Sequence, residues 1–288
     1  MSGIKKYLSM VKFSHSIFAM PFAILGFFLG IKLNPEISFD YTILIYIVLA
    51  MVFARNAAMG FNRYLDRNID KINPRTAQRE VASGVISSKN ALAFVIINSL
   101  LFIVVSGLIN MLTLFLSPVA LLVVLGYSYT KRFTPLCHLV LGTGLALAPI
   151  GAYISVTGAF NNIIPILFSF VVLFWTAGFD IIYALQDESF DKSHNLHSIP
   201  SLLGKKKALI VSRLLHLTSA ILVLINGYLL GSQFWYWVAS GIFIGLLYSQ
   251  HKLVKPNDLT KVNMAFFTMN GVASIIFASL VLLSLYLK

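Results

Sequence analysis

The chain has 288 residues, of which 58% are hydrophobic and only 11% are charged, and its formal net charge is +12. Soluble domains carry about 25% charged residues, so this composition predicts a polytopic protein of the lipid bilayer and argues against a soluble enzyme. The single cysteine, Cys137, excludes an internal disulfide and a CxxC metal or redox site. We expect the basic residues in short loops between membrane spans, and therefore no nucleic-acid-binding face.

Nine apolar segments of near-spanning length follow a basic N-terminal stretch. About 20 apolar residues cross the hydrocarbon core as a helix. We therefore predict an all-α bundle of nine transmembrane helices in a single domain over residues 1–288, with spans near 14–33, 41–61, 91–110, 112–129, 137–158, 163–184, 207–229, 233–250 and 264–286. The first segment is interpreted as an uncleaved span, because a signal peptide has a shorter apolar run followed by a cleavage site.

Most of the 22 Lys and Arg residues lie in loops on one side of this bundle. By the positive-inside rule, the N-terminus and the long loops at 62–90 and 185–206 are cytoplasmic, in an inner or plasma membrane. These two loops are expected to cap the cytoplasmic mouth of the bundle. An odd number of spans places the C-terminus on the other side.

Two acidic runs follow the second and sixth spans, with the sequences NRYLDRNID and DIIYALQDESFD. Half of the 10 acidic residues are aspartates of these runs, namely Asp66, Asp70, Asp180, Asp187 and Asp191. Asp187 follows Asp66 at the same interval at which Asp191 follows Asp70, and four spans separate the runs. This pattern predicts a duplicated four-helix unit, with pseudo-repeat halves at about 14–129 and 137–250.

The spacing within each run predicts that its polar oxygens share one face of a helix, because steps of four, seven and eleven residues return to nearly the same angle. The two sets are Asn62, Asp66 and Asp70, and Asp180, Asp187 and Asp191. Ionisable groups beside the membrane core need partners. Mg²⁺ binds a few carboxylates together with substrate phosphates, so two such faces could hold a diphosphate between metal ions. The simpler alternative is that the acids pair with neighbouring Arg and Lys at a solvated helix end.

These runs, together with NPRTAQRE and YSYTKRFT, resemble the UbiA superfamily of intramembrane aromatic prenyltransferases. Both signatures of that family, N-x-x-x-D-x-x-x-D and D-x-x-Y-A-x-x-D-x-x-x-D, are present in full. The resemblance covers nearly the whole chain and is strongest to the 4-hydroxybenzoate polyprenyltransferase group.

The resemblance implies Mg²⁺-dependent transfer of a polyprenyl group from an allylic polyprenyl diphosphate to an aromatic acid in quinone biosynthesis. One alternative is another acceptor, such as a naphthoate, a futalosine-type menaquinone precursor, haem or a chlorophyll precursor. A second is a secondary transporter, which would place charges at the midplane and interrupt matching spans.

The resemblance also implies individual roles. The metal ligands would be Asn62, Asp66, Asp70, Asp180, Asp187 and Asp191, and the catalytic aspartates among them Asp66, Asp70, Asp187 and Asp191. Four further residues would bind substrate. Arg79 and Lys131 match cap-loop basic residues that contact the diphosphate, Tyr183 matches the tyrosine of the second motif, and Arg55 matches an arginine that recognises the aromatic carboxylate. The alternatives are membrane anchoring for Arg79 and Lys131, packing for Tyr183, and a pair with a motif aspartate for Arg55.

Three features near these motifs carry expectations of their own. Glu80 and Ala82 stand where many relatives have prolines, which could loosen the first cap loop. Asn195 stands where many relatives have glycine, and asparagine tolerates the left-handed conformation that such a turn needs. His15, at the start of the first span, either packs at the interface or faces the aromatic substrate.

Overall fold

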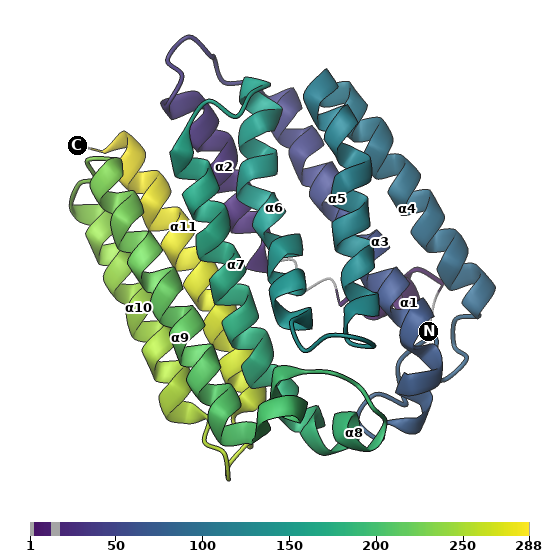
Figure 1. The fold of residues 1–288 in the computed structure, drawn as a ribbon. Coiled ribbons are helices and arrows are strands. Elements are labelled where there is room, and N and C mark those ends of the chain that lie inside the picture. The colour runs from purple at the N-terminus through teal and green to yellow at the C-terminus, as the bar shows by residue number, and fades with distance from the viewer. Residues whose placement is uncertain (1–2, 13–17, 288) are drawn as a thin grey trace.

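A computed structural model describes residues 3–12 and 18–287. Over these residues the fold is a bundle of long helices and contains no strand (Figure 1). The elements are α1 (Gly3–Met10), α2 (Met20–Lys32), α3 (Tyr41–Ile72), α4 (Ser88–Ile109), α5 (Met111–Thr130), α6 (Cys137–Thr157), α7 (Ile163–Ala184), the short 3₁₀ helix η2 (Leu185–Asp187), α8 (Glu188–Ser193), α9 (Ile199–Leu229), α10 (Phe234–Leu253), the π-helix η3 (Met264–Met269) and α11 (Asn270–Tyr286).

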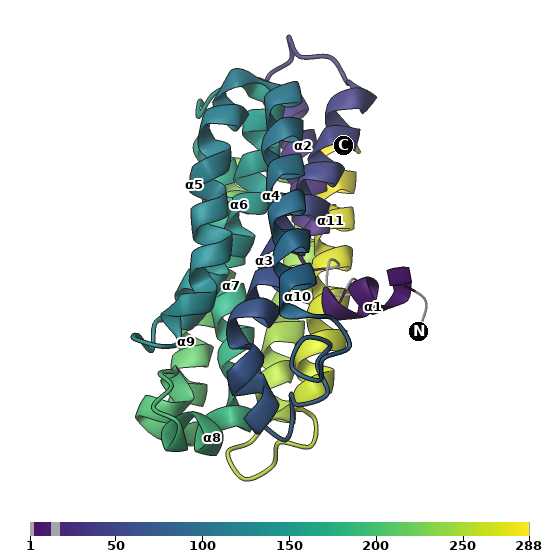
Figure 2. The same ribbon diagram turned by 90° about the vertical axis from the view of Figure 1, so that its right-hand side faces the viewer.

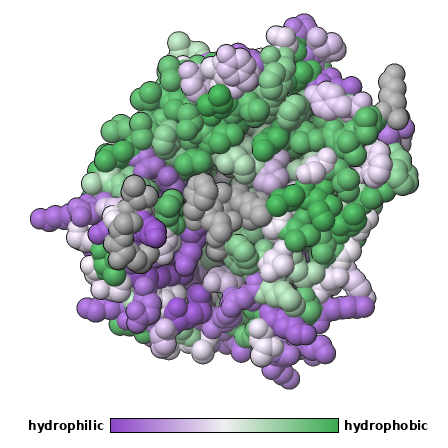
Figure 3. Space-filling view, turned by 180° about the vertical axis from the view of Figure 1, so that it is seen from behind, coloured by the Kyte–Doolittle hydropathy of each residue, from purple (hydrophilic) through white to green (hydrophobic). Residues whose placement is uncertain are grey.

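The long helices form an integral membrane bundle. Among the described residues, 7 helical segments are long and apolar enough to cross a bilayer, and α2 is a shorter apolar helix of 13 residues. The prediction of nine spans is thus confirmed for seven, while α2 and α10 pack beside them in the same bundle (Figure 2). Hydrophobic residues cover much of one face, and hydrophilic residues gather at one end (Figure 3). The start of the predicted first span, with His15, lies outside the described residues.

Helix α3 carries the whole first acidic run. It begins after Asp40, whose side chain accepts a hydrogen bond from the Thr42 N–H at 2.7 Å, and it ends at Ile72. Asn73 has an extended conformation, as expected for a residue that precedes a proline. The helix therefore extends well beyond the predicted span at 41–61, and it holds the first motif on one helical element as predicted.

The second acidic run does not lie on one regular α-helix, so the prediction that Asp180, Asp187 and Asp191 follow α-helical spacing is wrong. Helix α7 ends at Ala184, and a 3₁₀ turn with three residues per turn connects it to α8. Leu185 in this turn is 1% exposed and belongs to an apolar cluster with residues of α7 and α9. The change of helical period alters the angle between Asp180 and the later aspartates.

Trp175 of α7 lies in the centre of the main core. Its ring is fully buried and packs against Phe22 and Phe243, with centroid distances of 5.5 and 5.9 Å. Its indole N–H donates to Asn270 Oδ1 at 2.9 Å, and the Gln250 amide donates to the same oxygen at 2.6 Å. A buried polar network thus joins α7, α10 and α11.

Asn270 also fixes the π-helix η3 that precedes it. Its Nδ2 donates to the Phe266 carbonyl at 2.8 Å and to the Ala265 carbonyl at 3.2 Å. The wider turn of a π-helix leaves carbonyl groups outside the regular ladder, and such turns are frequent at functional sites. Asn270 therefore connects the buried polar network of the core to η3, which contains Phe266.

The first cap loop packs beneath α1. Met10 and Val81 are buried in one apolar cluster that joins α1 to this loop, and the Ser9 hydroxyl donates to a Glu80 carboxylate oxygen. Glu80 was expected to loosen the loop, but it tethers the loop to α1. In the second loop Asn195 has φ 53°, which confirms the predicted left-handed turn.

Candidate active site

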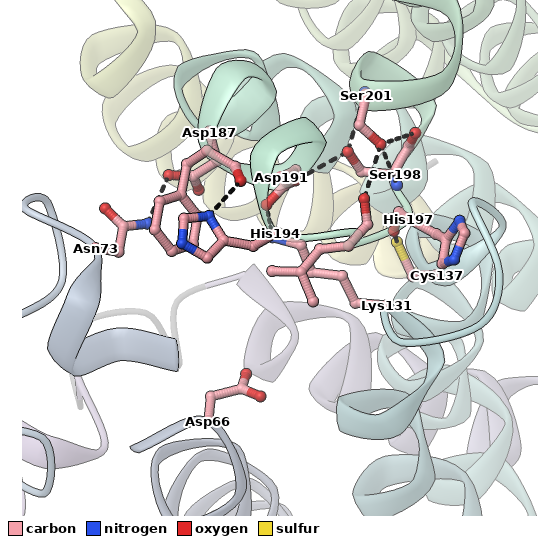
Figure 4. A network of polar contacts seen from close by, with 12 residues as sticks. Asp66, Asn73, Lys131, Cys137, Asp187, Asp191, His194, His197, Ser198 and Ser201 are labelled. Carbon is pink, nitrogen blue, oxygen red and sulfur yellow. Dashed lines mark hydrogen bonds and ion pairs between the residues drawn. The ribbon is translucent and has the colours of Figure 1, made fainter. Parts of the chain in front are cut away.

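Both acidic runs lie at one end of the bundle, which we call the motif end. The first cap loop at 73–87, the α5–α6 connection at 131–136 and the segment from η2 to α8 all lie there (Figure 1). Figure 4 shows Asp66 on one side of this region, with Asp187 and Asp191 on the other and Lys131 near Asp191. Side chains far apart in the sequence are therefore brought to one site, as predicted.

Each motif aspartate has a basic partner in the structure. The pairs are Asp66 with Arg132, Asp70 with Arg79, Asp180 with His138, Asp187 with Arg75, and Asp191 with Lys131, at distances of 2.8, 2.7, 2.6, 2.5 and 2.7 Å respectively. These are pairings of the kind that the simpler alternative expects. They also place the cations of the site within reach of any anion that enters between the two runs.

Arg75 makes the most extensive of these contacts. Its Nε donates to Asp187 Oδ1 at 2.8 Å and its Nη2 to Asp187 Oδ2 at 2.5 Å, which is a bidentate pair. Its Nη1 donates to the Tyr183 hydroxyl at 3.1 Å. Burial alone would lower the pKa of Arg75. The hydrogen bonds to Asp187 and Tyr183 and the charge of Asp187 have the larger combined effect, and they raise the pKa of Arg75. The guanidinium therefore stays charged.

Lys131 and Asp191 join the α5–α6 connection to α8. Asp191 is fully buried, and its Oδ2 accepts a hydrogen bond from the Ser198 hydroxyl at 2.9 Å. The His197 N–H donates to the Lys131 carbonyl at 2.7 Å, so the backbone beside the lysine is fixed as well (Figure 4). A buried carboxylate would be costly without such partners.

The first run is held by arginines from two different segments. Arg132 Nη2 donates to Asp66 Oδ1 at 2.8 Å, and the Asn62 amide donates to Asp66 Oδ2 at 3.0 Å. Arg79 Nη1 donates to Asp70 Oδ1 at 2.7 Å. Asn62, Asp66 and Asp70 thus lie in one row along α3, with Arg79 and Arg132 beside them.

The oxygen donors of the site fit a Mg²⁺ ion held jointly with a ligand. Among the described residues, no three His, Cys, Asp or Glu side chains converge as a complete protein cage. Mg²⁺ needs no such cage, because it is usually bound by one or two carboxylates, waters and substrate phosphates. Within the described part of the chain, Asp70 Oδ2 is buried and accepts no hydrogen bond. A carboxylate oxygen without a hydrogen-bond donor is chemically suited to bind a cation.

Arg55 lies on α3, two turns before Asn62 and deeper in the bundle. Its Nη2 donates to the Lys12 carbonyl at 3.2 Å, and it does not form the predicted alternative pair with a motif aspartate. In the described residues its Nε is buried and has no hydrogen-bond partner. An unfilled donor on a planar guanidinium suits a carboxylate.

An aromatic groove opens beside Tyr183. The Tyr183 ring stacks on Phe266 at 4.2 Å between centroids, and the Arg75 guanidinium lies over the Tyr183 ring, 5.2 Å from its centroid. The groove has a volume of about 490 Å³ and is lined by Tyr183, Asn263, Met264, Phe266, Phe267 and Thr268. Aromatic faces stabilise a nearby cation through their π electrons, so the groove could hold an apolar chain next to a charged centre.

The structure adds residues that the motif analysis did not select as site residues. Arg75 is part of the NPRT turn and Arg132 follows Lys131 in the YSYTKRFT segment, but no role was assigned to either residue or to His138. For Arg75 and Arg132 the signal was present, since each stands next to a segment that carries a predicted site residue. No sequence pattern singles out His138, because its partner Asp180 lies on another helix.

Comparisons with known proteins show to which family the chain belongs. The sequence model of the UbiA prenyltransferase family matches residues 19–272. The 4-hydroxybenzoate octaprenyltransferase of Aliivibrio fischeri (strain MJ11) is 31% identical over 84% of this chain and 83% of its own length. The apo structure of a UbiA homologue from Aeropyrum pernix K1 is 32% identical, covers 93% of this chain and 97% of its own, and has a TM-score of 0.84.

A UbiA homologue from Archaeoglobus fulgidus, solved bound to GPP and Mg²⁺, shares the fold at 22% identity. Its TM-score is 0.75, and the match covers 96% of this chain and 97% of that one. The family match, the relative at 31% identity and the shared fold all extend over most of the chain. The chain belongs to the UbiA prenyltransferase family.

Proposed function

We propose that this protein transfers a polyprenyl group from an allylic polyprenyl diphosphate to the ring of an aromatic acid resembling 4-hydroxybenzoate, in quinone biosynthesis. The observation that carries the proposal is the arrangement at the motif end, where two acidic motifs and their basic partners surround one site and Arg55 lies deeper in the bundle. The names of relatives such as the A. fischeri octaprenyltransferase support the choice of acceptor.

The six oxygen-bearing motif residues would hold Mg²⁺ in two groups, one on α3 and one at the end of α7 and in the following segment. The groups are Asn62, Asp66 and Asp70, and Asp180, Asp187 and Asp191. When bound, Mg²⁺ supplies positive charge that stabilises the departing diphosphate. The solved homologue with GPP and Mg²⁺ supports this assignment.

The basic residues of the site would move from carboxylates to the substrate. When a diphosphate enters, Arg75, Arg79, Lys131 and Arg132 can exchange an aspartate oxygen for a phosphate oxygen with little movement, because all four already line the site. They then stabilise the negative charge that develops as the allylic C–O bond breaks.

The remaining groups would position the two reacting carbons. Tyr183 and Phe266 present aromatic faces to the allylic cation, and Arg55 binds the carboxylate of the acceptor. A ring carbon ortho to the phenolic hydroxyl then forms the new C–C bond. The ring proton leaves to a motif aspartate or to the released diphosphate.

The test is prenyl transfer by purified protein in lipid nanodiscs with Mg²⁺, a radiolabelled polyprenyl diphosphate and a panel of aromatic acceptors. We expect product with 4-hydroxybenzoate and none from Asp66→Ala or Asp187→Ala. Product with only a naphthoate or another acceptor would retain prenyl transfer and overturn the aromatic-acid assignment. Absence of product from every acceptor, with diphosphate binding unchanged in both variants, would overturn the proposal as a whole.

We also propose that the motif end faces the cytoplasm of the cell, with the N-terminus on the same side. The Lys and Arg residues of the loops at that end support this orientation. Single cysteines placed in the loop at 73–87 in a Cys137→Ser background should react with a membrane-impermeant maleimide only after the cells are opened. Labelling of intact cells would reverse the orientation.

A further inference from the structure

We propose that His138 is a positioning residue that fixes Asp180 for ligand binding, an inference that rests on the proposed function. His138 lies in the first turn of α6 and is 2% exposed. Its Nδ1 is 2.6 Å from Asp180 Oδ2, and its Nε2 accepts a hydrogen bond from the Ile199 N–H at 3.3 Å. The imidazole therefore joins α6 to α7 and to the start of α9.

These two contacts determine the direction of the hydrogen bond to Asp180. A backbone N–H can only donate, so His138 Nε2 must present its lone pair to Ile199. The ring proton then lies on Nδ1, and Nδ1 donates to the Asp180 carboxylate. Both ring nitrogens are engaged, which leaves the imidazole no freedom to turn away.

His138 differs from the partners of the other four motif aspartates. Those partners are long side chains from loops or from the end of a helix, with side-chain exposures of 24 to 35%, namely Arg75, Arg79, Lys131 and Arg132. The His138 side chain is 3% exposed and has only two rotatable bonds. It cannot follow an incoming anion, so its contact with Asp180 persists when the other cations change partner.

The persistent contact holds one Asp180 oxygen and leaves the other available to a ligand. Among the second-motif aspartates, Asp180 lies on α7 itself, and its side chain is 22% exposed. Hydrogen-bond partners of metal-binding carboxylates orient those ligands, and their removal typically costs about 10–100-fold in metal affinity or activity. We therefore assign His138 the orientation of Asp180 and no direct contact with substrate.

Three substitutions separate the two hydrogen bonds of the ring. His138→Leu removes both, His138→Asn keeps an N–H donor at the position of Nδ1, and His138→Gln places its amide nearer the position of Nε2. His197→Asn is the matched control, because His197 is exposed and Figure 4 shows its ring directed away from Asp191. Size-exclusion profiles and melting temperatures of all four proteins report whether each variant folds.

The measurement is Mn²⁺ binding in the presence of inorganic diphosphate, followed by electron paramagnetic resonance, together with kcat and KM for prenyl transfer. We expect His138→Leu to weaken Mn²⁺ binding about 10–100-fold, His138→Asn to recover most of this loss, and His197→Asn to match the parent. Unchanged Mn²⁺ binding in a folded His138→Leu protein would overturn the inference. If the His138→Leu protein does not fold, the Mn²⁺ affinities of His138→Asn and His138→Gln are compared instead. Binding by His138→Asn that is no tighter than binding by His138→Gln would also overturn the inference.

Failure of the inference about His138 can be distinguished from failure of the proposed function. A parent protein that prenylates no acceptor refutes that function, whereas weaker Mn²⁺ binding by His138→Leu would still support the role of His138. If the parent prenylates its acceptor and His138→Leu binds Mn²⁺ as tightly as the parent, only the inference about His138 is refuted.

Discussion

Replacement of Arg75 by glutamine should destabilise the ligand-free protein, and the loss should be coupled to Asp187. Removal of one partner from a fully buried ion pair costs about 3–5 kcal/mol, whereas an exposed pair contributes about 0–1 kcal/mol. The side-chain exposures of Arg75 and Asp187 are 30% and 10%, which is between these limits. We therefore expect a loss of about 2 kcal/mol in the free energy of unfolding, because glutamine leaves a partly buried carboxylate without its bidentate partner.

The assay is a double-mutant cycle on thermal stability in one detergent. A loss of this size lowers the melting temperature by about 4 °C or somewhat more in a chain of this length. Arg75→Gln and Asp187→Asn should each lower it, while the double variant should be less destabilised than the sum of the two. Arg213→Gln is the control, because Arg213 is exposed on α9. Additive losses, or equal losses in Arg75→Gln and the control, would refute the reasoning.

Three further predictions concern the acceptor role of Arg55, the metal and the buried network at Asn270. Arg55→Leu should raise KM for 4-hydroxybenzoate at least about 10-fold while KM for the polyprenyl diphosphate stays unchanged, because a charged hydrogen bond contributes about 1.5–3 kcal/mol; an equal rise in both KM values would contradict the acceptor role. EDTA should abolish transfer and Mg²⁺ should restore it in the parent, whereas Asp191→Asn should need a higher Mg²⁺ concentration for half-maximal rate; identical Mg²⁺ curves would argue against a metal role for Asp191. Asn270→Leu should cost about 1–3 kcal/mol of stability, since it leaves the buried Trp175 N–H and Gln250 amide without their acceptor, and a melting temperature equal to that of the parent would show that the network is dispensable.

The first motif could be predicted well because its geometry is local. Asn62, Asp66 and Asp70 recur every four residues directly after an apolar span, and the proline after Asn73 marks where the helix ends. The left-handed turn at Asn195 follows from the same kind of local preference. In each case the backbone conformation depends on neighbours in the sequence.

The second motif and the ion pairs could not be predicted in the same way. The 3₁₀ turn after Ala184 places Leu185 among buried residues from other helices, and no local pattern reports that burial. Asp187 and Arg75 are 112 residues apart, and Asp180 and His138 are 42 residues apart. Several cations near each motif were plausible partners, and only the packing of the helices selects one for each aspartate.

The self-paired state of the site has a consequence for selectivity and for product release. A ligand that binds here must replace contacts that the carboxylates already make, so its observed affinity is the difference between new and lost interactions. A diphosphate, with more charge and more acceptor oxygens than a monophosphate, can replace several of these contacts at once. After transfer, the same carboxylates compete with the free diphosphate for the arginines and the lysine, so the protein itself opposes retention of its product.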